Sequence, residues 1–286
     1  TKLHKTNIPE RITKSLDNFN ITFLTAPPAY GKSVTLVDIL SKHHRKAIIL
    51  IPNQASIMLL HKYTSGLYKD RKIGYRMRNN MDSDFNDDVT LITTGYFLTW
   101  IKYNKNVLNN PLTLVIDEAH VSDEQTELVI RIALYTAQIN KELKVILSSA
   151  TLNINKFARF INSQIDMITL LDSPTNVDVK YLDEKGFDLL GLISNDLLGV
   201  NTLIICAGER EINNVITLLE ESKNTSIQSA TVKPLYSKLD SDDIHKALEI
   251  GDSWTILVAT NMVETSVTIN VDAVIDYGKR KNLKIL

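Results

Sequence analysis

Short apolar runs rich in β-branched residues alternate along this chain with stretches whose apolar residues recur at helical spacing. In the first half, the runs predict strands at residues 21–25, 47–51, 89–93, 112–116 and 144–148. The stretches between them predict helices at residues 32–42, 54–67, 96–103 and 122–138. Strands that alternate with helices over this length favour an α/β fold in which helices flank a parallel sheet.

The alternation pauses at residues 172–176 (Asp-Ser-Pro-Thr-Asn), a polar stretch with a proline that is typical of a linker. It then resumes, with strands predicted at residues 177–181, 202–207, 231–235, 255–259 and 273–276, and helices at 187–197, 211–221 and 241–249. A length of 286 residues suits two compact domains. We therefore predict domains at residues 1–172 and 177–286, built on the same plan.

Composition narrows the class of protein. Hydrophobic residues make up 44% and charged residues 23%, which is ordinary for a globular protein. The net charge of −1 does not indicate a strongly basic nucleic-acid-binding domain, although main-chain N–H groups and a few local cations can hold a phosphate backbone. Cys206, the single cysteine, excludes a disulfide framework and favours a reducing compartment, which we expect to be the cytoplasm. No membrane span or signal peptide is predicted.

Two features receive structural interpretations. The acidic stretch at residues 82–88 lacks the ligand spacing of a calcium site, so we expect a solvated loop. Trp100 lies at helical spacing within a predicted helix, and we expect it to pack in the core.

Residues 25–33 (Thr-Ala-Pro-Pro-Ala-Tyr-Gly-Lys-Ser) follow a predicted strand and open a predicted helix. In a P-loop at such a position, main-chain N–H groups surround a phosphate, a lysine reaches the β- and γ-phosphates, and a hydroxyl binds Mg²⁺. Nucleotide contacts are accordingly expected from Ala29, Tyr30, Gly31, Lys32, Ser33 and Val34. The alternative is a chance Gly-Lys-Ser at the start of a helix.

A second motif, Asp117-Glu118-Ala119-His120, follows a predicted buried strand, and ligands gather at such strand ends in α/β sheets. Asp117 can hold Mg²⁺, partly through water, as Ser33 can from the P-loop. Glu118 can orient or deprotonate an attacking water, and His120 could link the nucleotide to the second domain. A solvated acidic turn is the alternative. Ser149-Ala150-Thr151 follows the next strand and, taken alone, is most simply a strand-to-helix cap.

Taken together in this order, these three motifs resemble motifs I, II and III of superfamily 2 helicases. The pattern is most similar to the group that includes DEAH-box RNA helicases and the polyprotein helicases of flaviviruses and potyviruses. Further segments resemble motif Ia, a Gly-Tyr-x-x-Arg segment, motif Ib, motif IV, the segment after it and motif V, at residues 51–54, 74–78, 93–98, 203–212, 234–239 and 258–269. The resemblance extends from about residue 20 to 277.

The resemblance implies two tandem RecA-like P-loop NTPase domains that use Mg²⁺ with ATP or another NTP and hold single-stranded RNA, with DNA as the alternative. Nucleic-acid contacts are implied for Pro52, Asn53, Arg76, Arg78, Thr94, Gly95, Gly208, Ser237, Thr260 and Asn261. The catalytic residues implied are Lys32, Asp117, Glu118 and His120. Ser149 and Thr151 are implied to couple the two domains, and Glu264 and Ser266 to lie near the NTP.

The chain departs from the family pattern in three places. Ala26 and Ala29 replace two glycines that are usual in the P-loop, and the absence of a glutamine motif before Thr25 predicts weak base selectivity. The arginine-rich motif VI is absent, so the second domain is expected to be cut short before it. Arginine fingers contribute roughly 10³–10⁵ in rate. We therefore expect this chain alone to hydrolyse NTP poorly or not at all.

The function implied is an NTP-dependent RNA helicase or translocase of 3′-to-5′ polarity. Both chain ends resemble cuts from a longer protein, and with the compact motif spacing they favour a segment of a viral replication protein, in a host-cell replication complex with other replication proteins. Two alternatives stay open, a DNA helicase of the same superfamily and a nucleic-acid-binding module with weakened catalysis. The sequence does not separate RNA from DNA, because phosphate contacts carry no sequence information.

Overall fold

The computed structural model divides the chain into two compact units, unit 1 (Thr1–Asn176) and unit 2 (Val177–Leu286). It describes residues 8–27, 31–78, 81–83, 85–104, 106–120, 123–151, 156–157, 160–170, 178–182, 186–236, 238–239, 241–251, 253–260, 263, 269 and 271–278, without the side chains of residues 55, 241, 242, 244 and 245. Each unit is built around its own sheet.

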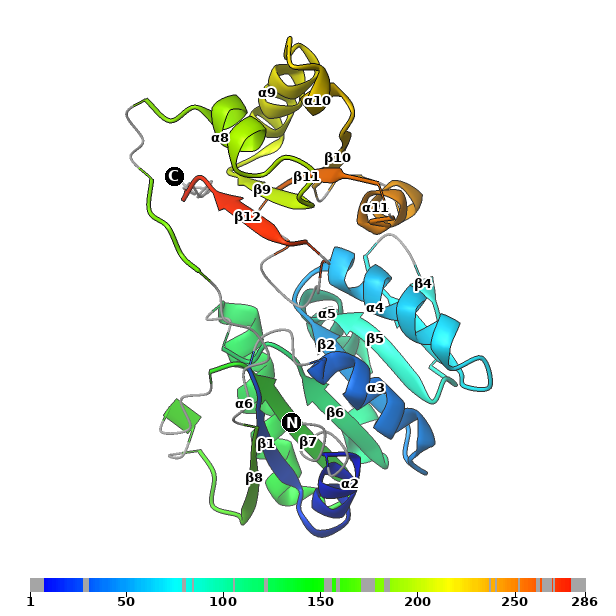
Figure 1. Cartoon of the computed structure of the whole chain (residues 1–286). Coiled ribbons are helices and arrows are strands. Elements are labelled where there is room, and N and C mark those ends of the chain that lie inside the picture. Colours follow the sequence, from blue (N-terminus) through cyan, green and yellow to red (C-terminus); the bar gives the residue numbers. More distant parts are fainter. Residues whose placement is uncertain are drawn as a thin grey trace, which may run out of the picture. The chain divides into compact units, whose positions relative to one another are not determined.

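Unit 1 contains a sheet in the order β4-β3-β5-β2-β6-β7-β1-β8 (Figure 1). Every pairing is parallel except that of β3 with β4. The strands are β1 (Ile21–Thr25), β2 (Ala47–Ile51), β3 (Ile73–Arg76), β4 (Met81–Asp82), β5 (Val89–Thr93), β6 (Leu112–Ile116), β7 (Leu143–Ser149) and β8 (Ile165–Thr169).

Helices cover both faces of this sheet. They are α2 (Ile8–Asn18), α3 (Lys32–Lys42), α4 (Gln54–Leu67), α5 (Thr94–Tyr103) and α6 (Glu124–Ile139), with the short 3₁₀ helix η1 (Val107–Asn109). On β2, Ile49 packs in the core cluster beneath α2, α3 and α4, whereas its neighbour Leu50 packs in the cluster beneath α5 and α6. Successive strand residues point to opposite faces, so a strand buried on both sides is apolar throughout. The predicted parallel α/β sheet is confirmed.

The predicted strands and helices of unit 1 agree with the structure to within two residues at each end. Helix α6 begins at Glu124 because the Asp123 carboxylate accepts a hydrogen bond from the Thr126 amide at 2.8 Å. Such a cap satisfies an amide that has no partner inside the helix. Helix α2 and strands β3, β4 and β8 were not predicted.

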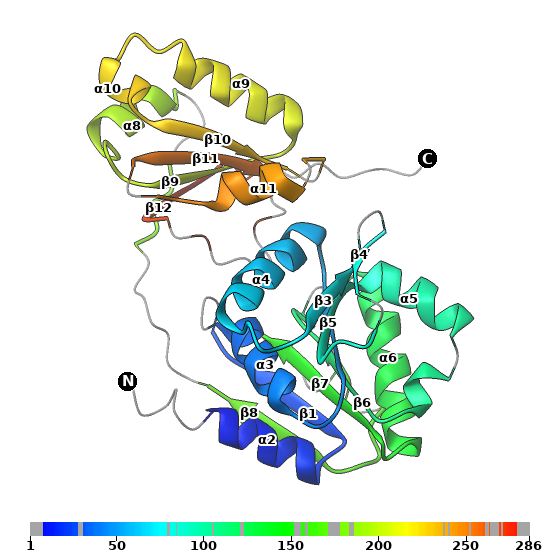
Figure 2. The same cartoon turned by 90° about the vertical axis from the view of Figure 1, so that its right-hand side faces the viewer.

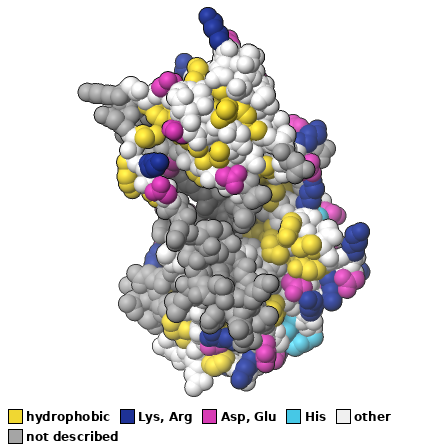
Figure 3. Space-filling view, viewed as in Figure 1, with side chains coloured by type: hydrophobic (Ala, Val, Ile, Leu, Met, Phe, Trp, Pro, Cys, Tyr) yellow, Lys and Arg dark blue, Asp and Glu magenta, His cyan; other side chains and the backbone are white. Residues whose placement is uncertain are grey.

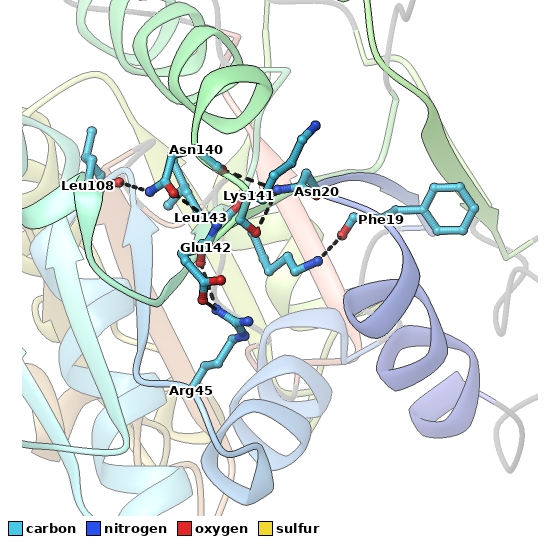
Figure 4. Close-up of polar contacts among 9 residues, drawn as sticks. Phe19, Asn20, Arg45, Leu108, Asn140, Lys141, Glu142 and Leu143 are labelled. Atoms are coloured by element: carbon cyan, nitrogen blue, oxygen red, sulfur yellow. Dashed lines mark hydrogen bonds and ion pairs between the residues drawn. The ribbon is translucent and has the colours of Figure 1, made fainter.

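A polar network fixes the amino ends of the central strands (Figure 4). The side-chain nitrogen Nδ2 of Asn20 donates to the carbonyls of Lys141 and Leu143, at 3.0 Å in each case. Lys144 donates from Nζ to the Phe19 carbonyl at 3.0 Å. These bonds join the turn before β7 to the turn before β1, and so hold the two strands in register.

The acidic stretch at residues 82–88 is more than the solvated loop that was predicted. Its Phe85 ring stacks on Trp100 of α5, with 4.1 Å between ring centroids, and Lys46 Nζ donates to the Phe85 carbonyl at 3.2 Å. Phe85 adopts a φ of 66°. Phe85 and Trp100 both pack against the core on the α5 side. The loop therefore covers this side of the core together with Trp100.

Gly74 is required where this loop crosses β3. A Cβ at this position would lie 2.6 Å from the Asp82 carbonyl oxygen and 2.7 Å from Ser83 Cβ. The Gly74→Ala variant is expected to lose about 1–3 kcal/mol of unfolding free energy, because the strand and loop must separate. Urea unfolding measures this loss. Gly66→Ala is the matched control, since no atom lies within 4 Å of its added Cβ; equal stability of the two variants would contradict the prediction.

Apolar side chains are exposed on α4. Tyr63 is 58% and Leu67 53% exposed, one helical turn apart, and apolar side chains gather over α3 and α4 in the space-filling view (Figure 3). Residues four apart share one helix face. The outward face of α4 is therefore apolar near its carboxyl end.

Unit 2 contains a parallel sheet in the order β10-β11-β9-β12. Its strands are β9 (Thr202–Cys206), β10 (Thr231–Leu235), β11 (Thr255–Thr260) and β12 (Ala273–Asp276). Helices α8 (Leu189–Asn195), α9 (Glu209–Glu220) and α10 (Thr225–Gln228) lie on one face, and α11 (Ser241–Leu248) packs beside β10 (Figure 2). The strands and longer helices predicted between residues 187 and 276 are confirmed.

The strand predicted at residues 177–181 is wrong over its described part. Residues 178–182 have no regular structure, and Val179 and Tyr181 are 64% and 95% exposed. Their alternation imitates a strand, but a strand needs a partner for its main-chain groups. The predicted linker at residues 172–176 lies outside the described residues. Within the described part of the chain, no helix is long and apolar enough to cross a membrane.

Candidate nucleotide site

The sheet order places the two main motifs at one edge. Strand β7 lies between β1 and β6, so the loop after β1 and the turn after β6 are one strand apart. All three strands are parallel, and their carboxyl ends therefore meet at the same edge.

Gly31 forms the last step of the loop into α3. Its φ of 77° and ψ of 25° are left-handed, a conformation that glycine adopts at little cost. Residues 28–30 lie outside the described part, so the predicted contacts of Ala29 and Tyr30 are not described. Val34 is half-buried and packs against the core cluster beneath α3.

Lys32 is buried, with 7% of its surface exposed. Its Nζ donates to the carbonyls of Ala26 and Pro27 at 3.1 and 3.3 Å. The ammonium group thus lies within the loop. Phosphate oxygens bound there would replace the two carbonyls as its hydrogen-bond acceptors.

Ser33 and Asp117 meet directly. Ser33 Oγ donates to Asp117 Oδ2 at 2.5 Å, and the Glu118 amide donates to Asp117 Oδ1 at 3.0 Å. Asp117 is 2% exposed. The predicted magnesium ligands, 84 residues apart in sequence, therefore lie side by side.

Glu118 has an unusual backbone and an unusual acidity. Its φ of 51° is left-handed, which costs a non-glycine residue about 1 kcal/mol. Burial, followed by the negative charge of Asp117, raises the pKa of the Glu118 carboxyl to about 7, against the opposing effect of Lys32. A carboxylate with a pKa near neutrality is suited to accept a proton from water.

His120 connects Glu118 to the third motif within unit 1. Its Nδ1 lies 3.3 Å from Glu118 Oε2 and 3.1 Å from Ser149 Oγ. Ser149 Oγ also donates to the Thr151 carbonyl at 2.9 Å. Burial and the positive charge of Lys32 lower the pKa of His120. The resemblance implied that Ser149 and Thr151 couple the two domains; within unit 1 the structure shows Ser149 in contact with His120 and with Thr151.

The predicted nucleic-acid contacts of unit 1 include residues with structural partners. Asn53 caps α4, because its Oδ1 accepts a hydrogen bond from the Ser56 amide at 2.8 Å. Arg76 lies 4.2 Å from the Phe85 ring centroid and donates to Tyr96 Oη at 3.4 Å. No local pattern predicts these aromatic partners, because they come from other segments of the chain.

The remaining predicted contacts differ in exposure. Arg78 is exposed and Pro52 half-buried, whereas Thr94 is buried in the first turn of α5. Gly95 faces α6, since a Cβ there would lie 2.9 Å from Gln125 Oε1. Among the described contacts predicted in unit 1, Arg78 is therefore the one most free to reach a phosphate.

In unit 2, Gly208 precedes α9 as its N-cap, and Thr260 ends β11 opposite Cys206. Burial raises the pKa of the Cys206 thiol to about 11, so this thiol is unreactive at neutral pH. Four predicted residues of unit 2 lie outside the described part of the chain: Ser237, Asn261, Glu264 and Ser266.

Comparison with protein families matches both halves of the chain. Residues 6–160 match the model for DEAD/DEAH box helicase, and residues 184–286 match that for Helicase conserved C-terminal domain. The crystal structure of Escherichia coli DEAH/RHA helicase HrpB is similar, with a TM-score of 0.77 and 23% identity over 95% of this chain and 36% of that chain. The fold is thus two tandem RecA-like domains of the α/β class.

Curated relatives are longer than this chain. ATP-dependent RNA helicase HrpA of Borreliella burgdorferi is 25% identical, over 96% of this chain and 35% of the relative. A homolog of that helicase from Haemophilus influenzae is 28% identical, over 72% and 16%. Putative ATP-dependent RNA helicase L540 of Acanthamoeba polyphaga mimivirus is 24% identical, over 94% and 42%. The chain spans less than half the length of each.

Proposed function

Because this chain belongs to the DEAD/DEAH box helicase family, we propose that it is the two-domain motor of an RNA helicase that hydrolyses ATP or another NTP with Mg²⁺. The observation that carries the proposal is the hydrogen bond from Ser33 to Asp117, beside the buried Lys32 and Glu118. Residues far apart in the sequence thus bring a hydroxyl, two carboxylates and an ammonium group together at the carboxyl edge of one sheet.

These residues fit a magnesium-bound nucleotide. A serine hydroxyl and a carboxylate are hard oxygen donors of the kind that Mg²⁺ accepts, usually together with several waters. The amino end of α3 follows the left-handed Gly31 without a side-chain cap, so its first amides are available to a phosphate. Mg²⁺, when bound, would offset the phosphate charge and orient the reacting groups.

The side chains divide the work between them. Lys32 would exchange its bonds to the Ala26 and Pro27 carbonyls for bonds to phosphate oxygens. Glu118 would accept the proton of the attacking water at its carboxylate, which is deprotonated above a pKa of about 7. His120 Nδ1 lies 3.3 Å from that carboxylate and also contacts Ser149. A change in the position of the Glu118 carboxylate would therefore be passed through His120 to Ser149.

RNA as the nucleic acid rests on relatives that are named RNA helicases. We propose single-stranded RNA as the ligand, gripped at its phosphates, with 3′-to-5′ movement. DNA stays the alternative, because phosphate contacts serve both. Arg78, exposed at the end of the β3 segment, is the cation we assign to this grip.

Source and location are proposals of the same kind. We propose a reducing, cytoplasmic setting, in keeping with the single buried Cys206. The narrower resemblance to flavivirus and potyvirus helicases, and a place in a viral replication complex, stay predictions from the motifs. The three relatives named above come from two bacteria and a giant virus, and so favour the DEAH helicases in general.

The test is NTP hydrolysis with and without single-stranded RNA, measured on this chain and on a longer form of the protein that carries the arginine motif. We expect the longer form to hydrolyse NTP faster when RNA is added, and the chain alone to be slow. Single-stranded DNA and duplexes with 3′ or 5′ overhangs separate the alternatives. Nucleic-acid binding without hydrolysis in the longer form would replace the proposal with a binding module.

A further inference from the structure

A buried hydroxyl without a partner lies beside the proposed magnesium site. Ser148 on β7 is fully buried, and its Oγ has no hydrogen-bond partner among the residues that the structure describes. Buried hydroxyls normally have a partner, because leaving one unpaired destabilises the fold. Packing alone therefore does not explain a serine here.

Ser148 and Asp117 occupy neighbouring positions on one face of the sheet. Val115 on β6 pairs with Ile146 on β7, and both belong to the core cluster beneath α3. Ser148 lies two positions further along β7, and Asp117 directly follows β6, two positions after Val115, with its amide still donating to Leu50 of β2. Residues two apart in extended backbone point to the same face. Directly opposite side chains on adjacent strands are close enough to interact.

Asp117 can accept another hydrogen bond. Its two oxygens each accept one donor, from Ser33 Oγ and from the Glu118 amide. An ionised carboxylate has about four acceptor positions. Asp117 therefore keeps acceptor positions for a donor on the sheet side, and Ser148 is a hydroxyl on that side.

We propose that Ser148 is a positioning residue whose hydroxyl donates to Asp117 when Ser33 and Asp117 together hold the magnesium–nucleotide complex. The inference rests on the proposed function and extends it to a residue outside the three motifs. Ser148 would touch neither the cation nor the nucleotide. The hydroxyl, which has no partner among the described residues, would thereby gain one.

The test compares Ser148→Ala with the unchanged chain in two measurements, Mg²⁺-dependent binding of ATP at equilibrium and thermal unfolding without nucleotide. We expect Mg²⁺-ATP affinity to fall about tenfold, because a hydrogen bond to a charged group is lost. We expect the Tm to rise by about 2–4 °C, because an unpaired buried hydroxyl is removed. Ser148→Thr, which keeps a hydroxyl, should restore affinity.

Thr113→Val is the matched control. Thr113 Oγ1 is also buried without a partner among the described residues. Thr113 lies on the same face of the sheet as Asp117, but four residues before it along the chain. This variant should raise the Tm and leave Mg²⁺-ATP affinity unchanged. Unchanged affinity in Ser148→Ala, or an equal loss in Thr113→Val, overturns the inference alone. Absence of Mg²⁺-dependent binding by the unchanged chain overturns the proposed function and this inference with it.

Discussion

Replacing Lys32 by alanine is expected to lower NTP hydrolysis by at least about 10²–10³-fold in a form of the protein that hydrolyses NTP. Lys32 is 7% exposed, and its ammonium group donates to the Ala26 and Pro27 carbonyls of the P-loop. Without it, the negative charge that develops on the phosphates is not compensated. Steady-state hydrolysis with single-stranded RNA measures the effect.

Lys144→Ala is the control for this variant. Lys144 is a second buried lysine of unit 1, with 8% of its surface exposed, but it bonds to Phe19 at the opposite ends of the strands. Its removal should lower stability and leave the rate per folded molecule unchanged. RNA-stimulated hydrolysis that survives in Lys32→Ala, or a comparable loss in Lys144→Ala, would remove Lys32 from the site.

Glu118→Gln is expected to slow hydrolysis by about 10²–10⁴-fold while NTP stays bound. Glutamine keeps the shape of the side chain and its contact with His120 but accepts no proton. Bound NTP should therefore be retained longer than by the unchanged protein. Retention is measured by rapid filtration after dilution. Glu142→Gln, which changes an exposed carboxylate paired with Arg45, is the control; equal release of NTP by the Glu118 variant and the unchanged protein would argue against a proton-accepting role.

The pH dependence gives a second signature of Glu118. Because burial and Asp117 raise its pKa to about 7, the carboxyl is protonated and inactive as a base below that pH. Hydrolysis should rise as pH increases through about 7 and then level off. Burial and the positive charge of Lys32 lower the pKa of His120, which moves its titration away from that of Glu118. In Glu118→Gln the residual rate should lose the rise near pH 7; its persistence would assign the titration to another group.

The central strands were predictable because their residues are apolar on both faces. Strands β2 and β6 are buried at every position. A short run of mostly apolar residues is typical of such a fully buried strand. Strand β8 was missed because only Ile168 is buried among its five residues. Strand β3 was missed because Gly74 and Arg76 interrupt its apolar pattern. The glycine is required by a loop that crosses it, which no local pattern shows.

The candidate site divides in the same way. Lys32, Asp117 and Glu118 were predictable because their motifs are contiguous and follow strand ends. The Glu118–His120–Ser149 contacts and the place of Ser148 depend on β7 lying between β1 and β6, and sequence alone does not give this strand order. The structural partners of Asn53 and Arg76 likewise come from tertiary packing.

Strand β7 connects the candidate site to the Asn20 network at the opposite edge of the sheet. It carries Ser148 and Ser149 at one end, and the Asn20 network fixes its other end, about 17 Å away at a strand rise near 3.3 Å per residue. A slip of this strand along its own axis would shift Ser149 against His120 and Ser148 against Asp117 in a single displacement. Asn20, at the other end of β7, therefore helps to hold the alignment on which the proposed proton transfer and cation binding both depend.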